Sequence, residues 1–485
     1  MKKFYITTAI DYVNANPHIG HAYEKIIADV LARWHRLNRE DVFFLTGTDD
    51  KAGKNEEAAK KANTPVKEFV DKNAKKFIEL CKKLNLSNDD FIRTIEPRHI
   101  KVVNEIFNKV YKKGNIYKGY YEGLYCKGCE AFYTEKDLIN GKCPEHRTIP
   151  EKVKEESYFF KLSKYKDKIL KLVKSKDFII PETRRNEIIK RLEDENLKDL
   201  SVSRTKLDWG IKTPIDNKHI IYVWFDALIN YYSAVQSKEK KRYWPADVHL
   251  VGKGINWFHS VIWPGILFSA NIKQPKKILV HGYLTVNGQK IGKSLGNTIN
   301  PVDIIDKYSV DALRYFLIRE IPFGEDGDFL EEALKLRINN ELANDLGNLV
   351  SRILTLVEKN FKTLKKSELD KKLTSKLNLN KIDSYMKKFE LHNALSEIWR
   401  FVNEVNKHIN EERPWELKGK ELEKHLYTLI ESLRIIAILT YAFMPETSDK
   451  INSQLGIKLG KLKDCKFGLI KEYKINKQGI LFKKV

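Results

Sequence analysis

The stretch Pro17-His18-Ile19-Gly20-His21 lies between a strand-like run, Lys3 to Ala9, and an amphipathic pattern from Ala22 to Leu37. A strand, a short loop and a helix in this order place backbone N–H groups and the positive end of a helix dipole around one point. Gly20 lets a nucleotide pack closely on the backbone, and the two imidazoles can donate hydrogen bonds to phosphate oxygens. The stretch predicts an anion site, although two surface histidines beside a turn would produce the same short pattern.

The surrounding sequence alternates strand-like and helical patterns. Asp41 to Thr46 has the pattern of a strand and Val66 to Leu84 that of a helix, which predicts strand-helix-strand units and a parallel sheet with ligands at its carboxyl ends. From about residue 116 to residue 211 the alternation lapses into a Cys- and Gly-containing stretch and charged helical segments such as Glu187 to Glu195. This part is predicted to be an insertion.

The strand pattern returns after the insertion, so we expect one discontinuous nucleotide-binding domain. The expected strands of its second half are Ile220 to Val223, His249 to Val251 and Lys277 to Val280. From Leu330 to about Ser448 the apolar residues recur at three- and four-residue steps, which predicts a helical bundle. The end of the chain, Ile475 to Val485, resembles a short hairpin that folds back on the body.

Composition limits the class of protein. The chain has 485 residues, enough for two or three structural units, and 88 Lys and Arg against 65 Asp and Glu. A net charge of +23 favours a polyanionic partner without proving one. Asp11 and Asn14 interrupt the apolar start before a signal peptide develops, and Glu431 and Arg434 lie inside the most apolar later stretch. We expect a cytoplasmic protein without a membrane span.

Three of the five cysteines form a metal-binding pattern. The segments Cys126-Lys127-Gly128-Cys129 and Cys143-Pro144-Glu145-His146 are separated by thirteen residues, the spacing of a tetrahedral structural zinc site. Glu145 could bind in place of His146, although the two-residue gap after Cys143 favours the histidine. A closed set of four ligands leaves no position for water, so we expect structural Zn²⁺ without a catalytic role. The predicted ligands are Cys126, Cys129, Cys143 and His146.

A second basic motif, Lys290-Ile291-Gly292-Lys293-Ser294, places two lysines three residues apart in a Gly-containing loop that could close over phosphates. It is not a Walker loop, because Gly288 and Gly292 are four apart where that motif requires five. In a chain with so many basic residues, a surface loop is the alternative. The pairing with the histidine motif favours a phosphate site.

Together the two motifs resemble the HIGH and KMSKS motifs of class I aminoacyl-tRNA synthetases, with Ile291 and Gly292 in place of Met and Ser. The resemblance implies a Rossmann-type parallel sheet interrupted by a zinc-containing connective insertion and followed by an α-helical anticodon-binding bundle. It also implies in-line attack of an amino acid carboxylate on ATP without a covalent protein intermediate. The implied ATP-binding residues are His18, Gly20, His21, Glu24, Gly252, Lys290 and Lys293, of which His18, His21, Lys290 and Lys293 would be catalytic.

Along nearly the whole chain the sequence is similar to methionyl-tRNA synthetases, from Ala9 to Tyr12, from Tyr222 to Ala227 and from His281 to Gly288. The similarity implies a pocket for L-methionine, and an aromatic pocket suits a thioether. Tyr12 and His259 could offer hydrogen bonds to its sulfur, while Asp49 would hold the ammonium with Arg204 as its basic partner. The implied methionine-binding residues are Ile10, Tyr12, Asp49, Arg204, Trp224, Ala227, Leu228, Tyr231, Ile255 and His259.

One position departs from the family pattern. Where the family commonly has Gly-Lys-Asp, this chain has Gly252-Lys253-Gly254, so the carboxylate expected near the ribose is missing. A backbone amide or a water could substitute for it.

In the helical part, Asn348, Arg352 and Trp415 match the positions that read the anticodon in the similar family. Asn348 and Arg352 are four apart and share a helix face, and Trp415 could stack on an unpaired base. The implied partners are L-methionine, ATP with Mg²⁺, and tRNA(Met) including the initiator, and a monomer is expected.

The expected domains follow the same resemblance. They are residues 1–115 and 214–289 for the two halves of the catalytic domain, 116–213 for the insertion with the zinc knuckle, 290–340 for the KMSKS-like loop and stem-contact region, and 341–485 for the anticodon-binding domain with the C-terminal tail. Two kinds of alternative remain: another enzyme with the same paired motifs, either a different class I synthetase or a nucleotidyltransferase, and a catalytically silent, zinc-containing RNA-binding protein. The intact His18, His21 and Lys293 disfavour the second.

Overall fold

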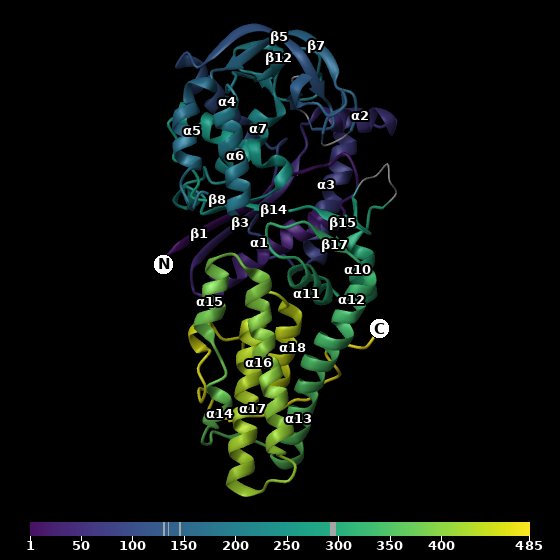
Figure 1. The fold of residues 1–485 in the computed structure, drawn as a ribbon, viewed down its shortest axis with the longest axis vertical. Coiled ribbons are helices and arrows are strands. Elements are labelled where there is room, and N and C mark those ends of the chain that lie inside the picture. The colour runs from purple at the N-terminus through teal and green to yellow at the C-terminus, as the bar shows by residue number, and fades with distance from the viewer. Residues whose placement is uncertain (130, 134, 145–146, 292–296) are drawn as a thin grey trace.

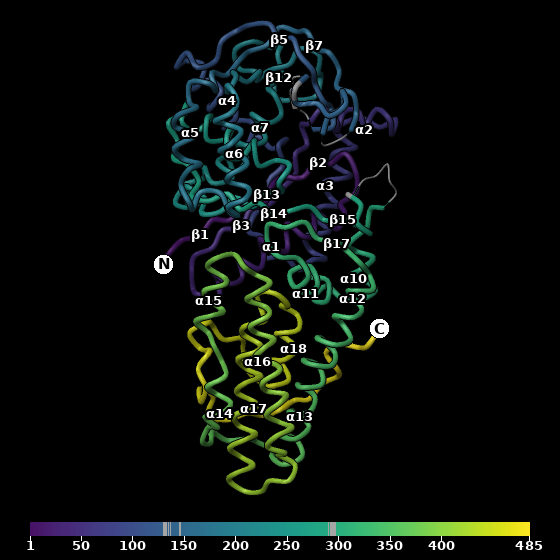
Figure 2. Tube along the Cα trace, in the orientation of Figure 1, coloured from purple at the N-terminus to yellow at the C-terminus, as the bar shows by residue number. Residues whose placement is uncertain are grey.

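The protein is elongated, with an α/β part at one end and a bundle of helices at the other (Figure 1). The computed structural model describes residues 1–129, 131–133, 135–144, 147–291 and 297–485. Within these residues, every helix is too short or too polar to cross a membrane. The trace in Figure 2 shows that the chain passes from the sheet into the upper part, returns to the sheet and then runs down into the bundle.

A parallel seven-stranded sheet forms the centre of the α/β part. Its main path is β2 (Asp11–Tyr12), β3 (Asp41–Asp49), β1 (Lys3–Thr8), β13 (Val248–Gly252), β14 (Ile278–His281) and β8 (Ile179–Ile180), and β4 (Asp90–Arg93) also pairs with β3. The strand order reverses between β1 and β13, and the crevice at the carboxyl ends of such a switch point is where open α/β sheets bind ligands. The predicted strands in the first half and at residues 249–251 and 277–280 are confirmed.

The two faces of the sheet bury different cores, because successive side chains of a strand point to opposite sides. Phe4 and Ile6 of β1 pack with α1 (Ile19–Leu37) in a core that continues into the helical bundle. Tyr5 packs on the other face, in a core shared with α4 (Pro97–Lys112) and α9 (Trp263–Ala270). Strands buried on both faces explain why these runs are continuously apolar.

The inserted region adds two small antiparallel sheets. One contains β6 (Ala131–Tyr133), β5 (Ile116–Cys126), β7 (Glu151–Phe160) and β9 (Leu200–Ser201), and the other contains β10 (Ser203–Arg204), β12 (Asp216–Ile221) and β11 (Lys212–Thr213). The helices of the inserted region are α5 (Lys166–Val173) and α6 (Glu182–Asp194), whereas α2 (Gly53–Lys61) and α3 (Val66–Lys83) follow β3 in the first half of the chain.

Two details of the predicted topology are wrong. The stretch Ile220 to Val223 does not return to the main sheet: β12 pairs antiparallel with β10 and β11, and Val223 begins α7 (Val223–Leu228). Conversely, β8 lies within the predicted insertion and yet pairs with β14 at the sheet edge. Apolar runs of two to four residues carry no information about which sheet they join, because that depends on distant partners.

The remaining chain is mainly helical, as predicted. After β15 (Leu284–Val286), β16 (Gln289–Lys290) and β17 (Gly327–Phe329), the helices are α10 (Pro301–Tyr308), α11 (Val310–Glu320), α12 (Glu331–Arg337), a π-helical stretch Ile338–Gly347, α13 (Asn348–Asn360), α14 (Lys371–Thr374), α15 (Leu379–Lys387), α16 (Leu391–Glu412), α17 (Gly419–Thr440) and α18 (Pro445–Leu455). The strands β18 (Leu364–Lys365) and β19 (Glu472–Tyr473) pair across the bundle.

The C-terminal tail folds back on the bundle without the predicted hairpin. No strand forms between residues 475 and 485, all of which the structure describes. Instead, the Gln478 N–H donates to Gln454 Oε1 at 3.0 Å and the Val485 N–H donates to Asn339 Oδ1 at 2.8 Å. The tail is therefore held by side chains of the helices rather than by strand pairing.

Arg314 of α11 joins the two parts of the molecule. Its side chain is fully buried, lies 2.7 Å from Asp29 Oδ2 in α1, and donates to the backbone carbonyls of Leu84, Ala442 and Phe443 at 3.1, 3.0 and 2.8 Å. Burial alone would raise the pKa of Asp29, but Arg314 and Arg33 lower it below the ordinary value. One guanidinium thus links α1 to the chain segments that follow α3 and α17.

Replacement of Arg314 tests this junction. Arg314→Met would leave the Asp29 carboxylate with one cation and three buried carbonyls without their donor, so we expect a loss of about 3–5 kcal/mol in the free energy of unfolding. Urea denaturation measures the loss. Lys2→Ala, which removes the exposed Lys2–Glu40 pair, is the matched control and should cost less than about 1 kcal/mol. Equal losses in the two variants would contradict the assigned role of Arg314.

Candidate active site

A cavity of about 410 Å³ opens at the carboxyl ends of β1, β3, β13 and β14. Its wall combines the loop after β1, the start of α1, the residues of α7 and the segment after β13, all of which meet at the switch point of the sheet. The residues predicted for ATP that line it are His18, Gly20, His21, Glu24 and Gly252. The residues predicted for methionine that line it are Ile10, Tyr12, Asp49, Trp224, Ala227, Leu228, Tyr231, Ile255 and His259.

The two histidines of the first motif cap the helix that they begin. His18 Nδ1 accepts the N–H of Gly20 at 3.1 Å, and His21 Nδ1 accepts the N–H of His18 at 3.0 Å. When neutral, each ring must therefore carry its proton on Nε2. A Cβ on Gly20 would lie 3.0 Å from His18 Cε1, so glycine allows the cap to form. The motif therefore positions two Nε2–H donors beside the helix N-terminus.

Glu24 contacts a residue that the sequence analysis did not single out, His281 at the end of β14. His281 Nδ1 donates to the Gly282 carbonyl at 2.7 Å, and His281 Nε2 lies 3.0 Å from Glu24 Oε2. The two side chains are therefore within hydrogen-bond distance of each other. His281 directly follows the predicted strand Lys277 to Val280, and this position at the carboxyl end of a strand could have identified it as a cavity residue.

Aromatic rings form the apolar half of the cavity. Trp224 stacks on Phe258 with 3.8 Å between the ring centroids, and it meets the rings of Tyr12 and His259 edge to face at 6.5 and 6.2 Å. Phe258 was not predicted and does not line the cavity; it supports Trp224 from behind. The arrangement leaves an apolar, polarisable recess that suits a thioether chain.

His259 is a structural part of this recess. Its Nδ1 donates to the Ile255 carbonyl at 2.9 Å, and its Nε2 accepts the Tyr231 hydroxyl at 2.7 Å. Burial lowers the pKa of His259 to about 4, so the ring is neutral. Both nitrogens are therefore used inside the protein, and the expectation that His259 donates to a ligand sulfur is not supported by this geometry.

Acidic side chains gather at the end of the cavity where Asp49 lies. Burial raises the pKa of Asp49 well above its ordinary value, and the neighbouring Asp226 and Asp50 raise it further. Both carboxylate oxygens of Asp226 are buried without a hydrogen bond among the described residues. Lys54, which the sequence analysis missed, also lines the cavity and partly offsets this charge. Burial and the neighbouring carboxyl groups therefore disfavour the charged form of Asp49.

Arg204 is the predicted methionine residue that the cavity does not include. Its guanidinium lies 4.6 Å from the Tyr222 ring and 3.8 Å from Glu155 Oε1. Among the described residues, the contacts of Asp49 lead to Lys51 and Thr94 and not to Arg204. The expected direct pairing with Asp49 is therefore not seen, because Arg204 instead supports the residue that precedes α7.

Gly254 faces a tyrosine. A Cβ at this position would lie 2.0 Å from the hydroxyl of Tyr283, so a side chain here would require the end of the Tyr283 side chain to move. Tyr283 also lines the cavity and was not predicted. A tyrosine hydroxyl thus occupies the place where the family pattern led us to expect a carboxylate.

The second motif is described only in part. The backbone of Lys290 ends the strand β16, and Ile291 lines the cavity. Lys293 and the side chain of Lys290 lie outside what the structure describes. The described part brings the motif to the edge of the same cavity as the histidines.

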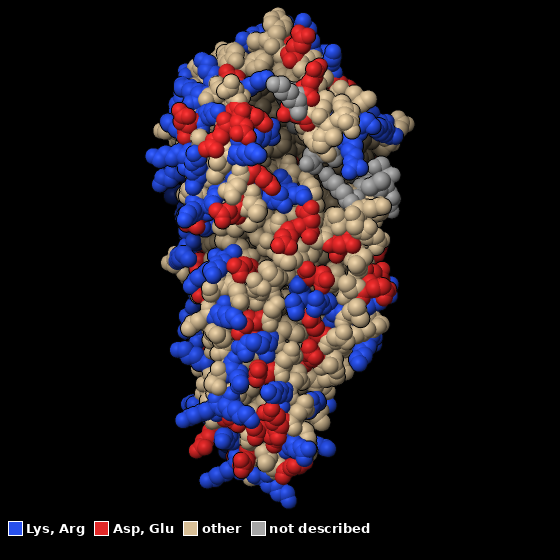
Figure 3. All heavy atoms as spheres, in the orientation of Figure 1, with Lys and Arg blue, Asp and Glu red and all other residues tan. Residues whose placement is uncertain are grey.

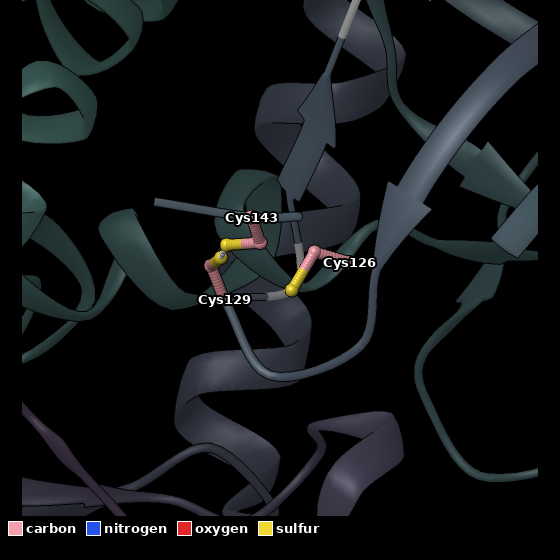
Figure 4. A group of neighbouring side chains, drawn as sticks. All are labelled: Cys126, Cys129 and Cys143. Carbon is pink, nitrogen blue, oxygen red and sulfur yellow. Dashed lines mark hydrogen bonds between the residues drawn. The ribbon is translucent and has the colours of Figure 1, made fainter. Parts of the chain in front are cut away.

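The three cysteines meet as predicted (Figure 4). Their sulfur atoms lie within 4.8 Å of one another, and Sγ of Cys129 is 3.4 Å from Sγ of Cys143. This separation excludes a disulfide, and three soft donors around one point suit zinc. His146, the predicted fourth ligand, lies outside the described residues. The loop is adjacent to the cavity, because the Trp224 indole N–H donates to the Cys129 carbonyl at 3.4 Å.

A second hollow, of about 510 Å³, lies in the bundle between α13 and α16. It contains Asn348 and Arg352, and Arg352 Nη2 donates to Asn410 Oδ1 at 2.8 Å. Trp415 is 53% exposed in the turn between α16 and α17. Residues of this hollow that were not predicted are Asn344, Asp345, Ser351, Asn403, Asn406 and Asn410. The steps from 403 to 406 and 410 are helical, so a stripe of asparagines was readable in the sequence.

Comparisons with known proteins agree with this geometry. A family model described as tRNA synthetases class I (M) matches residues 4–152 and 146–354, and one described as the anticodon-binding domain of tRNA ligase matches residues 370–477. The methionine–tRNA ligase of Caldanaerobacter subterraneus subsp. tengcongensis is 48% identical over 100% of this chain and 79% of its own length. The chain belongs to the methionine–tRNA ligase family. The family member from Thermotoga maritima is 46% identical over 93% of this chain and 74% of its own length.

A solved structure of the same family has the same fold. Mycobacterium tuberculosis methionyl-tRNA synthetase in complex with methionyl-adenylate superposes with a TM-score of 0.95 at 38% identity, covering 99% of this chain and all of that one. The free form of that synthetase superposes with a TM-score of 0.88 at 36% identity, covering 100% of this chain and 98% of that one. The predicted combination of a parallel α/β sheet and a helical C-terminal region is therefore confirmed.

The buried neutral His259 predicts a pH dependence of stability. Its pKa is lower in the folded chain than in the unfolded chain, so the unfolded state binds an additional proton between about pH 6.5 and pH 4, and stability falls as the pH falls through this window. His259→Gln should make the dependence of the unfolding free energy shallower by up to about 1.4 kcal/mol per pH unit. Denaturation at several pH values measures the slope.

Tyr231→Phe is the matched control. It removes the hydroxyl that donates a hydrogen bond to His259, but it removes no group that titrates between about pH 4 and pH 6.5. It should lower stability by a similar amount at each pH. Parallel curves for the wild type and His259→Gln would show that His259 is not held neutral by the fold.

Proposed function

We propose that this chain activates L-methionine with ATP to methionyl-adenylate and transfers the methionyl group to the 3′ end of tRNA(Met), initiator included. The products are pyrophosphate and AMP. The observation that carries the proposal is that one cavity joins the helix start with its two histidines, the aromatic recess and the buried Asp49. Membership of the methionine–tRNA ligase family supports it over another class I synthetase or a catalytically silent RNA-binding protein.

ATP would bind where α1 begins. The Nε2–H groups of His18 and His21 would donate to phosphate oxygens, and Gly20 leaves room for the nucleotide. Gly252 and the Glu24–His281 pair line the side of the cavity at β13 and β14 and would face the nucleoside. Lys290 and Lys293 would close over the phosphates, with Mg²⁺ accompanying ATP.

Methionine would bind with its side chain against Trp224 and Tyr12 and with its ammonium beside Asp49. A cation would be favoured here, because burial and the neighbouring Asp226 and Asp50 raise the pKa of Asp49 and a positive ligand would oppose this shift. Arg204 would act indirectly, by supporting Tyr222 and through it the start of α7. Ile10, Ala227, Leu228, Tyr231 and Ile255 would complete the apolar wall, and His259 would hold Tyr231 in place.

In the first step, a carboxylate oxygen of methionine forms a bond to the α-phosphorus while the bond from that phosphorus to the leaving pyrophosphate oxygen breaks. Negative charge grows on the phosphate oxygens, and the imidazole donors and lysines would stabilise it. In the second step, the terminal ribose hydroxyl of the tRNA attacks the methionyl carbonyl and AMP leaves. The protein forms no covalent bond to the substrate in either step.

Zinc would be held by Cys126, Cys129 and Cys143, with His146 as the proposed fourth ligand. It would have a structural role, because a sphere of four protein ligands leaves no position for a reacting group. Trp224 donates to the Cys129 carbonyl and Lys54 Nζ donates to the Gly128 carbonyl, each at 3.4 Å. The knuckle would therefore keep two residues of the methionine cavity in position.

The tRNA would contact both ends of the molecule. We assign anticodon contacts to Asn348, Arg352 and the exposed Trp415, and basic side chains spread from the α/β part to the tip of the bundle in Figure 3. The proposed domains are residues 1–115 together with 214–289, residues 116–213, residues 290–340 and residues 341–485. One strand of the insertion 116–213, β8, nevertheless belongs to the main sheet. We also propose that the chain acts in the cytoplasm as a monomer.

ATP–pyrophosphate exchange tests both the reaction and its amino acid. Across the twenty amino acids, exchange should be strongest with methionine, and exchange with none would overturn the proposal. Lys293→Ala should lower the exchange rate about 10²- to 10³-fold, because one charge that stabilises the transition state is lost, while methionine affinity stays unchanged. Lys2→Ala is the control for removing a lysine. An unchanged exchange rate in Lys293→Ala would exclude the assigned role of Lys293.

Trp415→Ala separates anticodon reading from adenylation. Loss of one base–aromatic stack should lower kcat/KM for aminoacylation of tRNA(Met) about 10- to 100-fold, whereas ATP–pyrophosphate exchange should not change. The two assays are run on the same preparation. An equal loss in both would show that Trp415 acts through the fold and not through the anticodon.

A further inference from the structure

Three titratable side chains meet in the helical bundle, away from the cavity and from the cysteines. Asp370 precedes α14 and caps it, His408 lies in the last part of α16, and His425 lies in the first part of α17. The exposed fractions are 9% for Asp370 and 4% for each histidine. Nothing in the methionine–tRNA ligase reaction requires this cluster.

The distances within the cluster are those of ligands around one ion. His408 Nε2 and His425 Nδ1 are 3.3 Å apart, and Asp370 Oδ2 lies 3.8 Å from the first and 3.6 Å from the second. The two contacts of the carboxylate are too long for hydrogen bonds. A point equidistant from the three atoms lies about 2.1 Å from each, within the range of Zn–N and Zn–O bonds.

The backbone orients the carboxylate toward the two rings. Asp370 Oδ1 accepts the N–H of Lys372 at 2.7 Å, and the N–H of Asp370 donates to Thr428 Oγ1 at 2.9 Å. These two bonds leave Oδ2 directed at the imidazoles. The ligand atoms are thus held in place by α14 and α17 before any ion is added.

A lysine close to the cluster, Lys372, is paired with other residues. Lys372 Nζ pairs with Glu411 and Glu412 at 3.0 Å each, and among the described residues it makes no ion pair with Asp370. A second group of possible metal ligands, Glu156, Asp216 and His219, does have a lysine paired with its carboxylates. There, Lys118 Nζ lies 2.8 Å from Glu156 and 3.8 Å from Asp216, and an ammonium already neutralises the carboxylates.

We propose that Asp370, His408 and His425 bind a divalent transition-metal ion, with Zn²⁺ the preferred species. Two imidazoles and one carboxylate suit zinc, and Co²⁺ or Ni²⁺ would occupy the same donor set. The ion joins three separate elements, α14, α16 and α17. Since Trp415 lies in the turn that connects α16 to α17, the ion also stabilises the two helix ends that flank this turn.

Metal content of the full-length protein tests the proposal independently of the cysteine site. After treatment with a chelator, reloading with Zn²⁺ and desalting, the wild type should retain one more zinc ion per chain than Asp370→Asn. Asparagine caps a helix as well as aspartate does, so this variant removes the ligand charge and keeps the α14 cap. His392→Gln, also in α16 but outside the cluster, should retain as much zinc as the wild type.

Two further measurements distinguish this site from the knuckle. In a Cys126→Ser, Cys129→Ser variant, Co²⁺ should still give the weak visible bands of a nitrogen and oxygen site without the intense sulfur-to-metal bands, and His425→Gln added to it should abolish them. Zn²⁺ should also raise the melting temperature of the cysteine variant, and not that of the same chain with Asp370→Asn. Equal zinc retention by the wild type and Asp370→Asn, or a cysteine variant that binds no Co²⁺, would overturn the proposal and leave a hydrogen-bonded histidine pair.

Discussion

The buried pair of Asp29 and Arg314 links the two parts of the molecule through α1. Asp29 lies in the middle of this helix, and the first motif lies at its N-terminus. Removing both charges from water is costly, and the structure offsets that cost with Arg33 and three backbone carbonyls, so that neither group is left without a partner. The helix that presents His18 and His21 is therefore held in place by the same contacts that attach the helical bundle. The same contacts therefore fix the position of the bundle, which matches an anticodon-binding domain, relative to the cavity.

A group of buried carboxyl groups lies at one end of the cavity. Asp49 lines it, Asp50 and Asp226 are its neighbours, and Asp50 is paired with Arg93. Burial and their mutual repulsion raise the pKa values of Asp49 and Asp226, and a positive ligand would oppose this shift. In the proposed complex, the ammonium of methionine would lie beside Asp49 and its side chain would lie in the aromatic recess. Recognition of the two ends of the substrate would then be divided between charge and apolar packing.

Support for the cavity comes from residues that do not line it. Phe258 backs Trp224, the cysteine loop accepts a hydrogen bond from the same indole, and Arg204 supports the residue before α7. In each case a residue acts through a neighbour, and its effect depends on positions far away in the chain.

The sequence by itself determined the element types and the chemistry of each motif. The continuous apolar runs of β1 and β3, the helical periodicity of α1 and α16, and the two Cys segments depend on neighbours a few residues away, which any reader of the chain can see. The resemblance to a known family added the residues of the cavity, and nearly all of those that the structure describes do line it. What the sequence could not determine were the pairings between distant segments. Ile220 and Ile221 belong to a small antiparallel sheet, whereas β8 joins the main sheet. Lys54, His281 and Tyr283 line the cavity together with residues that are distant in the sequence. The sequence likewise did not predict that Asp370, His408 and His425 lie close together. Only the tertiary structure decided these contacts, because a side chain's partners are set by the packing of whole elements and not by the local preferences of the chain.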